Sequence, residues 1–183
     1  MSGMRRAVGA VVLLGGLAGA ACTPGPAEPA PPTTPTPTAS QAPSETPQER
    51  QEQLDYAAAE KSYRTFRAEY NRVLRAGGAK EPTKVMKATA GGDYLAEFVE
   101  ITQAYKGLNG RDTGEERIVY VRTAGYEPTA IALKVCEDGR RIATLSGKKR
   151  IPGELRTANL EVRKVRGDWK VWSGTGRKVA TCA

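Results

Sequence analysis

The chain has 183 residues and a formal net charge of +8 at pH 7, from 28 basic and 20 acidic residues. It contains no histidine, which excludes Ser-His and Cys-His nucleophile pairs and removes the commonest zinc ligand. We therefore predict no catalytic residue, no metal site and no cofactor.

Residues 1–21 have the features of an export signal. Arg5 and Arg6 precede an uncharged stretch from Ala7 to Ala21 that is rich in small and apolar residues. This stretch is shorter than the roughly 20 residues that a membrane-spanning helix needs. The sequence predicts export, and the paired arginines leave the general secretory and the twin-arginine routes both open.

The residues before Cys22 resemble a bacterial lipobox, in which small residues precede a cysteine that receives diacylglycerol. The segment reads Leu17-Ala18-Gly19-Ala20-Ala21-Cys22, with Gly19 where the pattern prefers leucine. The alternative is an ordinary secretory signal cut after Ala20. We predict a lipid on Cys22 that holds the protein at the extracytoplasmic face of the bacterial cell membrane.

A linker is predicted between this anchor and the folded domain. Residues 23–50 contain nine of the twelve prolines, together with many Thr, Ala and Ser residues. Such a segment cannot bury enough apolar surface to offset its ordering entropy. We therefore predict a lipid-anchored, Pro/Thr-rich disordered linker over 22–50, able to reach about 90 Å when extended, and one domain over 51–183.

Three helices are predicted at the start of this domain. From Gln51 to Ala76, apolar residues recur every three or four positions and form one stripe: Tyr63, Phe66, Tyr70, Val73 and Leu74. A short helix is predicted from Pro82 to the Gly91-Gly92 pair. Asp93 is predicted to cap a third helix that ends at Gly107 and carries Leu95, Phe98, Ile101 and Tyr105.

After Gly107 the apolar period changes to two, which predicts strands. Asp138-Gly139 predicts a hairpin turn, and Gly167-Asp168 predicts a second one. The predicted strands are 116–123, 129–136, 140–145, 159–165 and 169–173, with 178–182 closing the edge. Helices followed by antiparallel strands indicate an α+β fold with the sheet curved around the first helix.

Three motifs carry a family resemblance: Cys136-Glu137-Asp138 at a strand end, Gly167-Asp168-Trp169-Lys170-Val171 in the last hairpin, and Cys182 near the end of the chain. With the order of elements, residues 51–183 resemble small actinobacterial lipoproteins with a nuclear transport factor two-like domain. The resemblance implies N-terminal helices packed in the concavity of a curved antiparallel sheet, giving a cone-shaped domain. It also implies a bridge between Cys136 and Cys182.

The cysteine count is consistent with that bridge. If the lipid occupies Cys22, Cys136 and Cys182 remain as an even pair in an oxidising compartment. The alternative is a pair of buried, unbridged thiols.

Positive charge is concentrated at the C-terminal end, where residues 134–183 hold 13 basic and 5 acidic residues. Lys148, Lys149 and Arg150 form a dense cluster that we predict to bind anions. The polyanions available outside the membrane are cell-wall polymers and lipid headgroups, and an envelope protein is a further possible partner. Nucleic acid is not expected there. The alternative is a solvated basic surface without a dedicated ligand.

The sequence therefore predicts a cell-envelope lipoprotein whose domain binds a ligand or a protein without catalysis. The alternative is an enzyme of the cyclase or isomerase type that uses the cavity of the cone. Family enzymes often pair an aspartate with a tyrosine or histidine, and four residues are candidates for such chemistry: Asp93, Asp112, Tyr105 and Tyr120. Each also has a structural interpretation, as a helix cap, a loop residue or packing in the cone wall.

Overall fold

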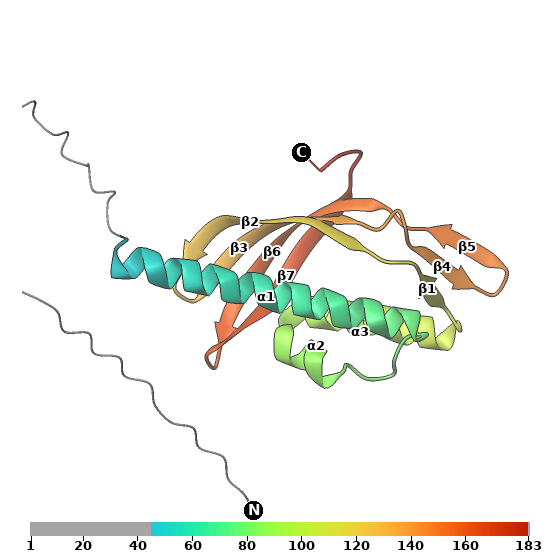
Figure 1. Cartoon of the computed structure of the whole chain (residues 1–183). Helices are drawn as coiled ribbons and strands as arrows, with labels where there is room; N and C mark the ends of the chain where they lie inside the picture. Colours follow the sequence, from blue (N-terminus) through green and yellow to red (C-terminus); the bar gives the residue numbers. More distant parts are fainter. Residues whose placement is uncertain (1–44, 183) are drawn as a thin grey trace, which may run out of the picture. The chain divides into compact units, whose positions relative to one another are not determined.

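The computed structural model describes residues 45–182. The signal segment, the Cys22 site and most of the linker lie outside the described residues. The helices are α1 (Pro47–Arg75), α2 (Lys84–Thr89) and α3 (Gly92–Gly107) (Figure 1). The strands are β1 (Arg111–Thr113), β2 (Arg117–Glu127), β3 (Ala130–Asp138), β4 (Ala143–Ser146), β5 (Lys149–Pro152), β6 (Leu155–Val165) and β7 (Asp168–Lys178).

Helix α1 begins four residues earlier than the predicted start at Gln51, inside the Pro/Thr-rich segment. The Thr46 hydroxyl accepts from the Glu49 backbone N–H at 3.2 Å, and the Glu49 carboxylate accepts from the Thr46 N–H at 2.7 Å. This capping box satisfies two end groups of the helix. Pro47 suits the first helical position because it has no N–H to leave unpaired there.

The predicted apolar stripe of α1 is confirmed as the centre of the core. All five of its residues are buried, and Tyr63 and Phe66 are fully so. They pack against the inner face of the sheet, which presents apolar side chains at alternate positions: Ile131, Leu133, Val135, Leu160, Val162 and Val171.

The third helix starts at Gly92 and is capped by Gly91, so the prediction that Asp93 is the cap is wrong. The Trp172 ring lies against this corner, where a Cβ atom on Gly91 would come within 2.6 Å of it. Gly92 has a φ of +53°. Both positions therefore favour glycine, and Asp93 lies in the first turn.

The strands form two antiparallel sheets, a four-stranded one in the order β2-β3-β6-β7 and a three-stranded one in the order β1-β4-β5. The predicted hairpin at Asp138-Gly139 is wrong, because β3 pairs with β2 and β6 whereas β4 pairs with β1 and β5. The Asp138 carboxylate accepts from Arg140, and the Gly139 N–H donates to the Glu154 carbonyl. These contacts direct the chain out of the first sheet and into the second.

The final hairpin is confirmed, with β6 and β7 longer than predicted. It turns through Arg166 and Gly167, both at positive φ, as two-residue hairpin loops require. Residues 178–182 were predicted to form an edge strand, but β7 already ends at Lys178 and residues 179–182 form no strand.

The arrangement confirms the predicted α+β class, with helices on one face of a curved antiparallel sheet (Figure 1). The C-terminal segment lies on the other face. There Cys136 and Cys182 form the predicted disulfide, with Cα atoms 6.0 Å apart. In the chain-entropy description, a loop of this length contributes about 4 kcal/mol of stability.

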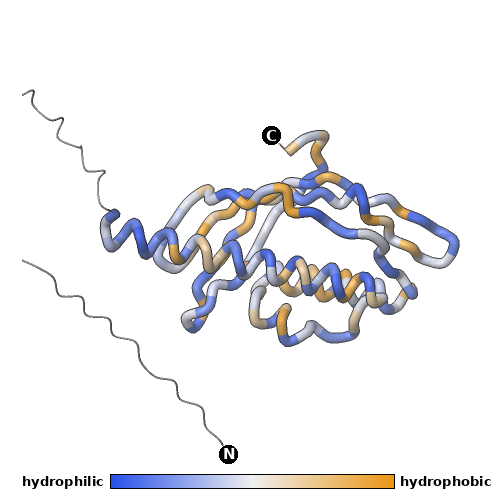
Figure 2. The backbone as a smooth tube through the Cα atoms, in the orientation of Figure 1, coloured by the Kyte–Doolittle hydropathy of each residue, from blue (hydrophilic) through white to orange (hydrophobic). Residues whose placement is uncertain are grey.

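Hydrophilic residues predominate at the N-terminal end of α1 and at the tip of the β4–β5 hairpin (Figure 2). Between residues 45 and 182, no helix is both long and apolar enough to span a membrane.

Candidate functional site

A cavity of about 390 Å³ lies between α1, α3 and the inner face of the sheet. Its volume falls in the range of small-molecule sites, about 300–1,000 Å³. Aromatic, acidic and hydroxyl side chains all contribute to its lining, including Tyr70, Phe98, Tyr105, Asp112 and Glu116. We take this cavity as the candidate site.

Aromatic rings from α1 and α3 form its apolar wall. The rings of Tyr70 and Phe98 pack edge to face with centroids 4.6 Å apart, and Tyr94 lies 4.6 Å from Phe98. Phe66 closes the cluster from behind, 5.1 Å from Tyr94. Aromatic pairs of this geometry stabilise one another beyond their buried area, so this wall is a packed cluster.

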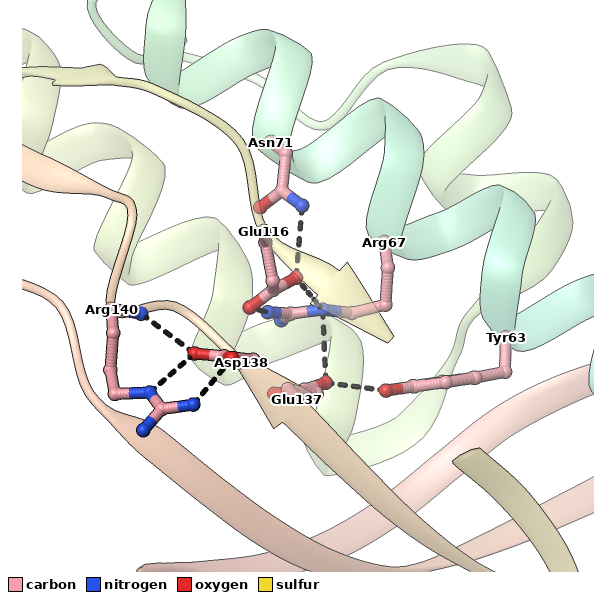
Figure 3. Close-up of polar contacts among 7 residues, drawn as sticks. All are labelled: Tyr63, Arg67, Asn71, Glu116, Glu137, Asp138 and Arg140. Carbon is pink, nitrogen blue, oxygen red and sulfur yellow. Dashed lines mark hydrogen bonds and ion pairs between the residues drawn. The ribbon is translucent and has the colours of Figure 1, made fainter. Parts of the chain in front are cut away.

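A buried ion cluster forms the polar wall (Figure 3). Arg67 contacts Glu116 at 2.5 Å and Glu137 at 3.1 Å, and the side chains of all three are at most 14% exposed. Glu116 immediately precedes β2, and Glu137 lies near the end of β3. The cluster therefore joins α1 to two neighbouring strands.

Two neutral side chains of α1 complete this cluster. The Tyr63 hydroxyl donates to Glu137 at 2.5 Å, and the Asn71 amide donates to Glu116 at 2.9 Å. Residues 63, 67 and 71 share one helix face because they are four positions apart. Burial raises the pKa of Tyr63, and the Glu137 charge raises it further.

Burial alone would lower the pKa of the Arg67 guanidinium, but the carboxylates of Glu137 and Glu116 raise it well above its usual value. Arg67 is therefore a permanent cation in the wall of the cavity. It was not among the predicted site residues. The sequence signal for it is a charge on the apolar stripe of the first helix, four residues after Tyr63 and three before Tyr70.

A second polar group in the cavity contains two of the four candidate catalytic residues, Tyr105 and Asp112. The Tyr105 hydroxyl donates to Asp112 Oδ1 at 2.9 Å, and the Thr144 hydroxyl donates to the same oxygen at 2.7 Å. All three residues line the cavity. Burial raises the pKa of Tyr105, and the Asp112 carboxylate raises it further, so the phenol stays protonated at neutral pH.

The other two candidates lie elsewhere. Asp93 lines an adjacent pocket with Glu97 and Glu161, and Glu97 also lines the cavity. Tyr120 pairs in register with Cys136, and the Arg122 guanidinium lies 4.3 Å from its ring centroid. Neither residue lines the cavity.

A third buried polar group lies at the opposite end of α1. Asp55 is 5% exposed and accepts from Tyr126, Lys164 and Trp169 at 3.1–3.2 Å. Trp169 is buried, whereas Trp172 is only partly buried. Asp55 joins the first helix to the last hairpin and lies outside the cavity lining.

The predicted anion-binding residues Lys148, Lys149 and Arg150 are exposed at the tip of the β4–β5 hairpin. Their side chains make no ion pair with any residue from 45 to 182. In contrast, Arg163 pairs with Glu161 at 2.6 Å and Lys164 with Asp55 at 3.2 Å. The hairpin tip therefore has uncompensated positive charge, while part of the charge on β6 is neutralised. Over the same residues, no group of three or more acidic or cysteine side chains is placed to hold a metal ion.

No family model matches the chain, and no curated protein matches it. One similar structure is a candidate dehydratase of the nuclear transport factor two-like family from Streptomyces avermitilis, with 11% identity, a TM-score of 0.48 and coverage of 70% of this chain and 99% of that one. Another is a nuclear transport factor two-like protein with a cystatin-like fold from Novosphingobium aromaticivorans, with 8% identity, a TM-score of 0.44 and coverage of 76% and 94%.

Proposed function

We propose that this domain binds a small molecule in its cavity and acts as a ligand-binding module outside the bacterial cell membrane. The observation that carries the proposal is the cavity of about 390 Å³, in which packed aromatic rings face a buried, hydrogen-bonded ion cluster. Side chains fixed by packing and by hydrogen bonds form a preorganised site, which lowers the entropy cost of binding.

Binding without catalysis is favoured by the state of the acidic groups. Glu116 and Glu137 are both engaged with Arg67 and with a second donor. A carboxylate held in this way is poorly placed to react with a substrate, because the substrate would have to displace one of these donors and leave it unpaired. The ion cluster therefore suits a structural wall of the site better than a reacting group.

The location of the domain rests on the sequence. The lipobox-like segment ending at Cys22 and the Pro/Thr-rich linker support a lipid-anchored domain on the extracytoplasmic face of the membrane. The exposed cluster Lys148–Arg150 supports a second contact, with an anionic cell-wall polymer or with headgroups.

Native mass spectrometry of the full chain extracted from membranes tests the binding proposal. Gly176 lines the cavity, and a Cβ atom there would have neighbours at 3.5–3.7 Å, so Gly176→Leu adds bulk without a backbone clash. We expect the wild-type chain to retain a small molecule that Gly176→Leu has lost. Gly107→Leu is the control, because a Cβ atom at Gly107 has no neighbour within 4 Å. A wild-type chain without any bound molecule contradicts the proposal.

The second candidate function is a cyclase- or isomerase-type enzyme. It is favoured by the Tyr105–Asp112 hydrogen bond, which places a protonated phenol beside a carboxylate in the cavity. Asp112 is the candidate general base in this case. Incubating the recovered ligand with the wild-type chain and with Asp112→Asn distinguishes the two functions, because only an enzyme converts it in an Asp112-dependent way.

A further inference from the structure

The polar wall of the cavity has more negative than positive charge. Two guanidinium groups line it, those of Arg67 and Arg156, against five carboxylates: Glu97, Asp112, Glu116, Glu137 and Glu154. Arg67 pairs with Glu116 and Glu137. Arg67 compensates one charge of its two glutamate partners. Unpaired charge in a partly buried site is costly, so a ligand with a positive charge is favoured there over a neutral or negative one.

The Tyr70 hydroxyl provides an independent observation. Tyr70 is 6% exposed, yet among residues 45–182 its hydroxyl has no hydrogen-bond partner. In the described part of the chain, every fully buried side-chain nitrogen or oxygen atom has a hydrogen-bond partner. The unpaired Tyr70 oxygen is therefore not fully enclosed. Tyr70 lines the cavity, where burial raises the pKa of its hydroxyl and the charge of Arg67 opposes that rise. This hydroxyl is therefore available to a molecule inside the cavity.

Asp112 has the matching free acceptor. Its Oδ1 atom accepts from both Tyr105 and Thr144, whereas its Oδ2 atom has no partner among the described residues. Tyr70 and Asp112 thus present two oxygen atoms, one phenolic and one carboxylate, to the same space. An ammonium group carries three N–H donors and no acceptor, which complements two such oxygens.

The aromatic wall is suited to a cation as well. The Arg67 guanidinium already lies 5.2 Å from the Tyr70 ring centroid and 5.5 Å from that of Phe98. Ring faces attract cations within about 6 Å of the centroid. The rings therefore stabilise one cation of the chain itself, and the Tyr105 ring extends this surface toward Asp112.

We infer that the ligand of the cavity is a small organic cation whose ammonium group donates to Asp112 Oδ2 and to the Tyr70 hydroxyl. This inference rests on the proposed function, because it names the chemical class of the molecule that the cavity binds. It requires no covalent step and no cofactor.

Three probes of nearly equal size and shape test it with the full chain: tert-butylammonium, tert-butanol and pivalate, which are cationic, neutral and anionic. Chemical shifts of backbone amides in α3 report binding in the cavity. We expect tert-butylammonium to bind about tenfold more tightly than tert-butanol, the ratio that one modest charge interaction gives. We expect pivalate to produce no shift in α3.

Two variants locate the effect. Asp112→Asn should weaken tert-butylammonium binding about tenfold and leave tert-butanol binding unchanged. Tyr70→Phe removes only a hydroxyl and should weaken the binding of tert-butylammonium roughly three- to tenfold. Asp168→Asn, an exposed aspartate at the start of β7, is the matched control and should bind like the wild type.

The outcomes separate this inference from the proposed function. Binding of pivalate or tert-butanol in the cavity as tight as that of tert-butylammonium overturns the cation inference and leaves the binding proposal intact. An equal loss of tert-butylammonium affinity in Asp168→Asn and Asp112→Asn also overturns the cation inference, because the negative charge would then act at long range. If no probe shifts α3 but a native ligand is lost in Gly176→Leu, the cation class is wrong while the cavity remains the site.

Discussion

The Arg67 guanidinium donates two hydrogen bonds to the Glu116 carboxylate, from Nη2 at 2.5 Å and from Nε at 3.2 Å. The two residues are 49 positions apart in the chain, one on α1 and the other just before β2. A bidentate pair fixes both the distance and the orientation of its partners. This contact therefore sets how far the sheet stands from the helix, and so how wide the cavity is.

Removing this guanidinium should destabilise the domain strongly. Arg67→Ala leaves Glu116 and Glu137 buried without a counter-charge, and breaking a buried pair in this way costs about 3–5 kcal/mol. Urea denaturation measures the loss in free energy of unfolding. Arg64→Ala is the control, because Arg64 forms an exposed pair with Glu60 one turn earlier and should lose ~0.5 kcal/mol or less. Similar losses in the two variants would show that the buried cluster is not a structural element.

Asp55 should make stability depend on pH in the acid range. Burial raises the pKa of this carboxyl, but hydrogen bonds from Lys164, Tyr126 and Trp169 lower it more, and the pKa lies below its ordinary value. A carboxyl with a lower pKa in the folded chain contributes stability above its unfolded pKa of about 3.9. That contribution is lost as the pH falls through the lowered, folded value.

Asp55→Asn should therefore cost about 2 kcal/mol at pH 7, and the difference from wild type should shrink as the pH approaches 2. Urea denaturation at pH 7, 4 and 2.5 measures this trend. Asp168→Asn, at an exposed position, should follow the wild type at every pH. A difference between Asp55→Asn and wild type that is constant from pH 7 to 2.5 would mean that the charge of Asp55 is not what stabilises the fold.

Cys22→Ser should release the protein from membranes, because the thiol is the group that forms the thioether with diacylglycerol. Fractionation of cells that express either chain measures the distribution between membrane and medium. Cys136→Ser is a control for the loss of a cysteine as such, and it should stay with the membrane. If Cys22→Ser is retained in the membrane fraction as fully as the wild type, the lipid-anchor proposal is wrong.

The basic hairpin tip should bind anionic surfaces in a salt-dependent way. Replacing Lys148, Lys149 and Arg150 with Ser should weaken sedimentation of the chain with anionic vesicles or wall fragments at low salt. High salt should weaken wild-type binding similarly, since exposed charges are screened within about 8 Å at physiological ionic strength. Replacing Arg50, Arg64 and Arg72 with Ser changes the net charge equally on α1 and should matter little, because each of these pairs with a glutamate. If the two triple variants weaken binding equally, the hairpin tip is a solvated basic surface without a dedicated ligand.

The residues show why some of the fold was predictable from the sequence. The stripe from Tyr63 to Leu74 follows the helix period, so its burial could be predicted from spacing alone. The disulfide could be predicted from the parity of the cysteines and from the family resemblance. In contrast, Asp138-Gly139 has the composition of a hairpin turn but directs the chain into another sheet, because Gly139 bonds to Glu154 rather than closing a turn. A long-range bond of this kind leaves no local pattern.

The candidate site was less predictable for the same reason. Tyr105 and Asp112 were candidates, but Thr144, which completes the group, is 32 positions beyond Asp112. Arg67 stands out as a charge on an apolar stripe, but its partners Glu116 and Glu137 lie on distant segments. Spacing along one helix cannot identify such partners, because only the fold brings them together.

A crystal structure of the full chain purified from membranes with its native ligand tests the central claim most directly. We expect a small molecule in the cavity, with a nitrogen atom within hydrogen-bond distance of both Asp112 Oδ2 and the Tyr70 hydroxyl. A cavity that holds only ordered water, with the native ligand bound elsewhere on the chain, would contradict it.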